Sequence, residues 1–325
     1  MNAVTELDVL ELEKTLARYH IGELIRYWPA ANGIENSNYF LCTSCDDSER
    51  EYVLTIVKQP SNSGPAYVPL LDVCIDAGLP VARVIRNTNG DPYDELAGKP
   101  VLLAPRLAGR HPHNPTVKQI QALASFTARF HLATAKLDFP VPSYPRNSIW
   151  LSEQRDLTQG RLPYSSYRML EDTVSRVNSL LARRDTGELP TGVIHGDLFR
   201  DNVLFNERGL NGVLDFHHAA TGYLIYDLAV IANDWCTDAN GVLDTERTVA
   251  LMRAYNKIRP FTKQEIWFFP SFALYAAVAF WLSRLSVALS DDGNKRVNNP
   301  EEFERIVQQH SAHSFYLDDR LLNFQ

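Results

Sequence analysis

The sequence predicts an α+β protein with a small β-rich lobe followed by a larger, mainly helical lobe. Two observations support this prediction. Short apolar runs bounded by turn residues dominate the first hundred residues, which is typical of strands. After Pro105 the apolar residues recur at helical spacing over long segments, apart from a strand-like stretch at 193–216. We place the N-terminal lobe at 1–104, a connector at 105–109 and the C-terminal lobe at 110–325.

The N-terminal lobe is expected to begin with an amphipathic helix capped by Thr5 and Asp8. Helical spacing of apolar residues predicts a second helix over 68–77, which ends at Gly78. The remaining apolar runs of this lobe read as strands. These five segments are 24–28, 38–43, 52–57, 81–85 and 101–104.

The C-terminal lobe is expected to contain long helices at 116–135 and 166–183, and to be helical again after Asp227. The turn residues at 206–209 predict a hairpin between two short strands. The apolar segment 266–289 is close to the length that spans a bilayer. Because it contains a proline and charges follow, we expect a buried helix there.

The composition indicates an ordinary soluble globular protein. The chain has 325 residues, of which 45% are apolar and 22% are charged. Its 32 basic and 39 acidic residues give a net charge of −7, which argues against a nucleic-acid partner. Four cysteines are too few for a disulfide framework, and Cys42 and Cys45 have no second ligand pair for zinc. The chain begins with no signal peptide, so we expect a cytoplasmic protein without a membrane partner.

The stretch 193–205 carries the strongest chemical pattern. An apolar run leads into His195, Gly196 and Asp197, and Asn202 opens the next apolar run. A further apolar run ends in Asp215, thirteen residues later. Phosphoryl transfer needs this set: one Asp that orients the attacking hydroxyl, and an Asn and a second Asp that hold Mg²⁺ against the phosphates. The alternative is structural, with an Asx-turn at Asp197 and a cap at Asn202.

This pattern resembles the aminoglycoside phosphotransferase and choline kinase superfamily, whose fold is a two-lobed protein-kinase-like one. The resemblance implies ATP, Mg²⁺ and a small-molecule alcohol as acceptor. It implies that Asp197 is the catalytic base, that Asn202 and Asp215 are the Mg²⁺ ligands, and that His195 braces the loop. Phe199 stands where many members have a second histidine, and we expect this difference to affect loop packing.

The resemblance also places the nucleotide site in the first lobe. The loop between the first two strands is rich in small and amide-bearing residues, whose backbone N–H groups can approach phosphates. From this loop, the third strand and the connector we expect a set of nucleotide-binding residues. They are Gly33, Asn36, Ser37, Asn38, Thr55, Pro105 and Leu107.

One feature of the superfamily is missing. Thr55 occupies the strand position where a phosphate-binding Lys or Arg is expected, and Lys58 should face the other side of the strand. The following helix offers Asp72 and Asp76 but no glutamate partner. The protein is therefore either a pseudokinase or a member of a subfamily that holds its phosphates with loop groups and Mg²⁺.

Several segments resemble such a subfamily, the kinase-fold homoserine kinases. They are 36–40, 53–55, 105–109, 226–236 and 280–285. This resemblance implies phosphorylation of L-homoserine to O-phospho-L-homoserine, a step of threonine biosynthesis. Homoserine carries an ammonium, a carboxylate and a hydroxyl, so Asn233, Asp234 and Arg284 are candidate substrate-binding residues.

Two other functions stay open at this point. The acceptor could be another alcohol, such as an aminoglycoside, choline or a thiosugar, or the protein could be a non-catalytic pseudokinase. Asp227 is expected to hold structure rather than to contact a ligand.

Overall fold

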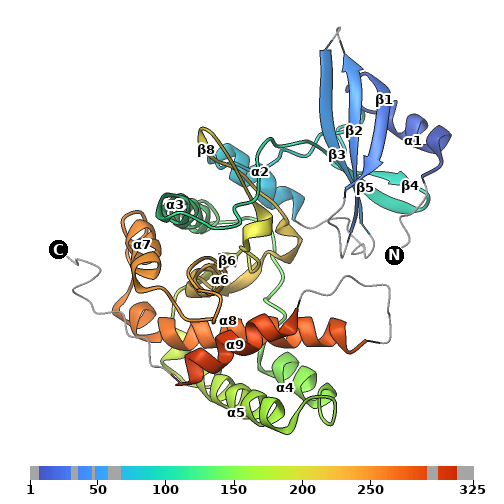
Figure 1. Cartoon of the computed structure of the whole chain (residues 1–325). Helices are drawn as coiled ribbons and strands as arrows, with labels where there is room; N and C mark the ends of the chain where they lie inside the picture. The colour runs from blue at the N-terminus through green and yellow to red at the C-terminus, as the bar shows by residue number, and fades with distance from the viewer. Residues whose placement is uncertain (1–6, 31–35, 46–47, 58–66, 291–298, 313–325) are drawn as a thin grey trace. The chain divides into compact units, whose positions relative to one another are not determined.

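The computed structural model describes residues 7–30, 36–45, 48–57, 67–290 and 299–312. Within these residues the chain divides into two compact units. Unit 1 contains the described residues up to Gly109 together with Asn211–His217, and unit 2 contains Arg110–Leu210 and the described residues from His218 onward. Figure 1 shows the elements of each unit. The chain therefore passes from unit 2 into unit 1 at Asn211 and returns to unit 2 after His217.

Unit 1 is built on a five-stranded antiparallel sheet with the order β1-β2-β3-β5-β4. Two helices accompany it, and the chain order places α1 before the sheet and α2 between β3 and β4. The elements are α1 (Val9–Leu16), β1 (Glu23–Pro29), β2 (Ser37–Cys45), β3 (Ser48–Ile56), α2 (Val68–Asp76), β4 (Asp94–Leu96) and β5 (Lys99–Pro105).

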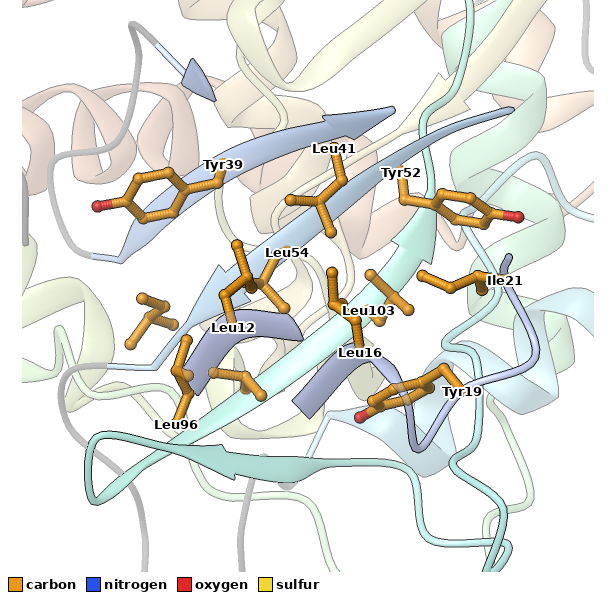
Figure 2. Packing of buried hydrophobic residues seen from close by; sticks show 12 residues of the cluster. Leu12, Leu16, Tyr19, Ile21, Tyr39, Leu41, Tyr52, Leu54, Leu96 and Leu103 are labelled. Atoms are coloured by element: carbon orange, nitrogen blue, oxygen red, sulfur yellow. The ribbon is translucent and has the colours of Figure 1, made fainter. Parts of the chain in front are cut away.

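The core of unit 1 lies between α1 and one face of this sheet. Leu12 and Leu16 of α1 pack over Leu54 and Leu103 of the central strands (Figure 2). In β3 the side chains of Tyr52, Leu54 and Ile56 are buried, while those between them are partly exposed, as the two-residue period of a strand requires. The sheet therefore has one packed face and one face that carries Thr55.

The N-terminal helix has a different cap from the one that the sequence predicted. Asp8 is the N-cap of α1, and its carboxylate accepts hydrogen bonds from the backbone N–H groups of Leu10 and Glu11. Thr5 lies outside the described residues.

The strand predictions for unit 1 need two corrections, one wrong strand and one missed strand. The segment 81–85 is not a strand: Val81 forms a single isolated bridge with Val213, and the buried Val81 and Val84 serve packing rather than sheet pairing. The strand β4 was missed because its Asp-Glu-Leu sequence carries no apolar alternation. Backbone pairing with β5, through a turn at Ala97 and Gly98 with positive φ at both residues, defines this strand instead.

Unit 2 is mainly helical, and it contains the short strand pairs of the 191–223 region. Strand β8 begins in this unit and ends in unit 1, and the short helix η3 begins in unit 1 and ends in unit 2. The helices are α3 (Val117–Ala133), α4 (Ser148–Leu157), α5 (Tyr164–Leu181), α6 (Ile225–Trp235), α7 (Thr245–Asn256), α8 (Lys263–Ala288) and α9 (Pro300–Ala312). The strands and short 3-10 helices are η1 (Thr186–Glu188), β6 (Thr191–Ile194), η2 (Arg200–Asn202), β7 (Val203–Asn206), β8 (Gly209–Val213), η3 (Phe216–His218) and β9 (Ala220–Tyr223).

The predicted helices at 116–135 and 166–183 correspond to α3 and α5, and the predicted hairpin corresponds to β7 and β8. The sequence prediction missed α4, whose cap is the Asn147 side chain. Helix α4 contributes one fully buried residue, Leu151, so its sequence shows little helical periodicity.

Helix α8 is the apolar segment that resembled a membrane span. It has 26 residues and a mean hydropathy of 1.6 over its most apolar window, which satisfies the length and composition of a span. However, 78% of that window is buried inside the protein. Figure 1 shows α9 running along α8, and Arg284 of α8 forms an ion pair with Glu302 of α9. Helix α8 is thus a buried helix of unit 2, as the sequence predicted.

Candidate active site

The residues of the chemical pattern lie on a loop of unit 2 that follows β6. Strand β6 ends at Ile194, His195 to Phe199 form the loop, and η2 contains Asn202. The apolar run that precedes the loop is buried in β6, and the apolar run that follows is buried in β7. Both ends of the loop are therefore held by buried strands, which is the arrangement that a fixed catalytic group needs.

The predicted base and one predicted metal ligand are in direct contact. Asn202 Nδ2 donates hydrogen bonds to Asp197 Oδ2 at 2.8 Å and to the Asp197 backbone carbonyl at 2.8 Å. These two bonds use the amide nitrogen, so the side-chain oxygen Oδ1 is the atom that Asn202 can offer to a cation. Asn202 is 8% exposed, which limits its alternative rotamers.

Asp227 of α6 anchors the start of this loop. Its buried carboxylate accepts hydrogen bonds from the backbone N–H groups of His195 at 2.9 Å and Gly196 at 2.8 Å. His131 Nε2 lies 3.0 Å from the same carboxylate, and His131 Nδ1 lies 2.7 Å from the hydroxyl of Tyr255. Asp227 therefore holds structure, as expected, and what it holds is the backbone next to Asp197.

His195 braces the loop from within. Its side chain is fully buried, and its Nδ1 accepts a hydrogen bond from the Asp197 backbone N–H at 3.3 Å. Gly196 has a φ of +77°, a conformation that favours glycine. A Cβ at this position would lie 3.1 Å from Tyr144 Cε2. The ring of Tyr144 therefore packs directly against the residue that precedes the predicted base.

Phe199 takes part in the packing of the loop, as the family resemblance led us to expect. Its ring lies 4.6 Å from that of Phe280 in α8 and 5.9 Å from that of Phe303 in α9, both edge to face. The aromatic residue in place of the second histidine thus joins the loop to the helical core.

All three predicted substrate residues have partners within the protein, and two of them, Asp234 and Asn233, belong to α6. Asp234 accepts hydrogen bonds from the backbone N–H of Arg200 at 2.7 Å and from its guanidinium at 3.1 to 3.2 Å. Burial raises the pKa of the Asp234 carboxyl, and Arg200 opposes this shift. Asn233 donates to the Ala273 carbonyl at 2.8 Å and accepts from His310 Nε2 at 2.8 Å. These contacts favour a bracing role for both residues.

The third residue, Arg284, also binds protein groups. Its Nη1 lies 3.0 Å from the Asn299 carbonyl and 2.5 Å from Glu302 Oε2. Its guanidinium lies 4.4 Å from the ring centroid of Phe303. Substrate contact by Arg284, Asn233 and Asp234 stays a prediction.

The second predicted metal ligand belongs to unit 1. Asp215 follows β8 with a φ of +70°, which is unusual for a residue with a side chain and marks a tight local conformation. Its carboxylate Oδ1 lies 2.5 Å from His217 Nδ1, and its side chain is 46% exposed. The carboxylate is an oxygen donor of the kind that Mg²⁺ prefers.

Within unit 1 the predicted nucleotide residues that the structure describes lie in or beside the sheet, with Asn38 and Thr55 on the face opposite the packed one. The strand register pairs Asn38 with Thr55, and Thr55 with Leu102. Ser37 pairs with Ile56 and Pro105 with Tyr52, so each predicted strand residue lies within this sheet. Asn36 directly precedes β2 and Leu107 follows β5. Gly33 and Lys58 lie outside the described residues.

The two acids of α2 have arginine partners elsewhere in unit 1. Asp72 pairs with Arg86 at 2.7 Å, and Asp76 lies 4.0 Å from Arg83. The acids of α2 therefore form ion pairs with arginines that follow the helix, and not with a strand lysine.

The cysteines take no part in these sites. All four are free thiols, and Cys42 lies 3.3 Å from Glu49. Among the residues that the structure describes, no three His, Cys, Asp or Glu side chains gather in a metal-binding group.

The antiparallel sheet, the helical unit and the Asp–Asn loop define a protein-kinase-like phosphotransferase. The chain belongs to the phosphotransferase enzyme family, whose sequence profile matches residues 27–261. A homoserine kinase of Pseudomonas aeruginosa is 39% identical over 315 residues, which cover 96% of this chain and 98% of that relative. A homoserine kinase of Methylobacillus flagellatus is 34% identical and covers 96% of each chain.

Solved structures share the fold at low sequence identity. An amicoumacin kinase superposes with a TM-score of 0.69 at 17% identity, covering 94% of this chain and 92% of that one. A choline kinase from Streptococcus pneumoniae superposes with a TM-score of 0.65 at 13% identity, covering 90% and 95%. These likenesses confirm the predicted fold class.

Proposed function

We propose that this protein transfers the γ-phosphoryl group of ATP to the hydroxyl of L-homoserine and forms O-phospho-L-homoserine. The observation that carries the proposal is the hydrogen-bonded pair of Asp197 and Asn202 on a loop anchored at both ends. The near-full-length similarity to homoserine kinases selects the acceptor. Phosphoryl transfer requires the reacting groups to be aligned, and a loop held at both ends supports such an alignment.

Asp197 acts as the general base. Its carboxylate accepts the proton of the acceptor hydroxyl while the hydroxyl oxygen forms a bond to the γ-phosphorus. The bond from that phosphorus to the bridging oxygen breaks, and ADP leaves with the electron pair. Asn202 holds the Asp197 carboxylate at 2.8 Å, so the base keeps one orientation through the transfer.

The donor chemistry of Asn202 and Asp215 fits Mg²⁺, because one offers an amide oxygen and the other a carboxylate. Mg²⁺ bound by these residues would neutralise charge on the phosphates. We assign the phosphates and the nucleotide to the open sheet face of unit 1, where Asn38 and Thr55 are cross-strand neighbours. Gly33, Asn36, Ser37, Pro105 and Leu107 complete the proposed nucleotide site.

We place the enzyme in the cytoplasm. Its four cysteines are free thiols, which suits a reducing compartment. Both proposed substrates, ATP and a free amino acid, are available in that compartment.

ADP release in a coupled assay tests the proposal. The acceptor panel is L-homoserine, choline, an aminoglycoside and a thiosugar, each with Mg²⁺ and with excess EDTA. We expect release with homoserine and Mg²⁺, and its loss with EDTA. Release with another alcohol in preference to homoserine contradicts the acceptor assignment. An absence of release with every acceptor, together with retained ATP binding, supports the pseudokinase alternative.

A further inference from the structure

We infer that Arg146 binds the carboxylate of the amino-acid acceptor and thereby selects an amino acid over a simple amino alcohol. This inference rests on the proposed function, since it concerns the same acceptor. Arg146 lies in unit 2, two residues after Tyr144 and just before the cap of α4. It is a different arginine from Arg284, which the sequence pattern had suggested.

Contacts on one side of the catalytic loop lead to Arg146 through tyrosines. Tyr144 packs on Gly196, the residue before Asp197. The Tyr144 hydroxyl donates to the Tyr226 hydroxyl at 2.8 Å, and the Tyr226 ring lies 5.0 Å from that of Tyr275. The Tyr275 hydroxyl donates to the Arg146 backbone carbonyl at 2.6 Å. The backbone of Arg146 is thus fixed relative to the residues next to the base.

Contacts on the other side of the loop lead to the Arg146 guanidinium. Phe199, two residues after Asp197, packs on Phe280 at 4.6 Å. The guanidinium carbon of Arg146 lies 4.2 Å from the centroid of the same Phe280 ring, and Nη2 donates to Ser283 Oγ at 3.3 Å. The guanidinium of Arg146 therefore lies against an aromatic ring that also contacts the catalytic loop.

The electrostatics of Tyr144 agree with this geometry. Burial raises the pKa of its phenol, the Arg146 guanidinium acts to lower that pKa, and the Asp197 carboxylate acts to raise it. The guanidinium of Arg146 and the carboxylate of Asp197 thus both interact electrostatically with the Tyr144 phenol.

The chemistry of a guanidinium in this position suits a carboxylate. A guanidinium stacked on an aromatic ring keeps its N–H edges for acceptors in its own plane, and a carboxylate is the acceptor that matches them in pairs. Homoserine bound with its hydroxyl at Asp197 would present its other end to Arg146.

The test compares L-homoserine with two analogues that lack the carboxylate charge: 3-aminopropan-1-ol and L-homoserinamide. The wild-type kcat/KM should favour homoserine over each analogue by about 10- to 100-fold, the size of a lost charge-assisted pair. In Arg146→Gln this preference should fall to near unity, mainly through a higher KM for homoserine. Turnover of 3-aminopropan-1-ol should stay close to the wild-type value.

Arg183→Gln is the matched control. Its guanidinium lies 5.4 Å from the Phe268 ring and pairs with Asp185, so it removes a similar stacked arginine elsewhere in unit 2. It should keep the wild-type preference.

Two results overturn the inference. If the wild type turns over homoserine and both analogues equally well, no group reads the carboxylate, and this result needs no folded variant. If the wild type prefers homoserine and folded Arg146→Gln keeps that preference, another group reads the carboxylate. In both cases the proposed function survives. If the wild type fails to phosphorylate homoserine at all, the proposed function itself fails and this inference fails with it.

Discussion

The carboxylate of Asp227 accepts a hydrogen bond from the backbone N–H of Gly196 at 2.8 Å, and this bond ties helix α6 to the residue before the predicted base. A second bond from the His195 N–H and the contact with His131 complete the surroundings of this buried acid. The position of Asp197 therefore depends on a helix that is distant from it in the sequence.

We predict that Asp227→Asn lowers both stability and turnover. The substituted amide replaces an acceptor oxygen by a donor, so one buried backbone N–H loses its partner. The free energy of unfolding should fall by about 1–3 kcal/mol. kcat should fall more than the KM values change, because the loop, and not a substrate contact, is disturbed. Urea unfolding and steady-state kinetics measure the two effects; unchanged kcat in a folded variant would contradict the anchoring role.

Replacement of the base gives the second prediction. Asp197→Ala should reduce kcat by roughly 10²- to 10⁴-fold, the usual contribution of a general base. Binding of ATP, measured by calorimetry, should persist because the nucleotide is assigned to other residues. Asp201→Ala serves as the control, since this carboxylate lies on the same loop segment and is exposed. An Asp197→Ala variant with most of its activity would show that another group accepts the proton.

The pair of Asp234 and Arg200 allows bracing to be separated from substrate binding. Arg200→Met would leave the nearly buried Asp234 carboxylate without its cation, and we expect a loss of about 3 kcal/mol of stability. If Asp234 braces the loop, Asp234→Asn should lower stability and kcat with little change in the KM for homoserine. A large rise in that KM at unchanged stability would instead show that Asp234 contacts the substrate ammonium.

His310 gives a pH prediction. Burial lowers the pKa of this histidine to about 4 from its ordinary 6.5, and its Nε2–H donates to Asn233. The unfolded chain therefore binds the proton more readily, so this contribution to stability is present above about pH 6.5 and is lost as the pH falls toward 4. Its size over that window is about 3 kcal/mol.

The check is the difference in unfolding free energy between the wild type and His310→Gln at several pH values. Glutamine keeps a hydrogen-bond donor but does not titrate. The variant should approach the wild type in stability as the pH falls from 7 to 5. A constant difference across this range would show that His310 does not titrate on unfolding.

The features that depend on residues close together in the chain could be predicted from the sequence. The Asp197 and Asn202 spacing predicted a pair that the structure joins at 2.8 Å, because five residues across one short loop leave few other arrangements. Strand β3 was recognised as an apolar run that follows a charged turn, and the register in the structure places Asn38 beside Thr55. These features depend on neighbours in the chain.

What the sequence did not reveal depends on contacts between distant segments. Asp227 meets Gly196 across 31 positions, and Arg146 meets Ser283 across 137. No local pattern encodes such pairs. Arg146 lies between a proline-rich stretch and the Asn147 cap, and this position is the one local signal that could have drawn attention to it. Conversely, Asn233 and Arg284 were chosen by charge and amide chemistry that protein partners also satisfy.

The most direct test of the central claim is the identity of the product. The purified protein is incubated with ATP, Mg²⁺ and an equimolar mixture of L-homoserine and the competing alcohols, and the products are followed by phosphorus NMR and mass spectrometry. We predict one new phosphomonoester, on the side-chain oxygen of homoserine, formed in a one-to-one ratio with ADP. Phosphate on a different alcohol, or ADP formed without any phosphomonoester, would contradict the assignment of this chain as a kinase that acts on homoserine.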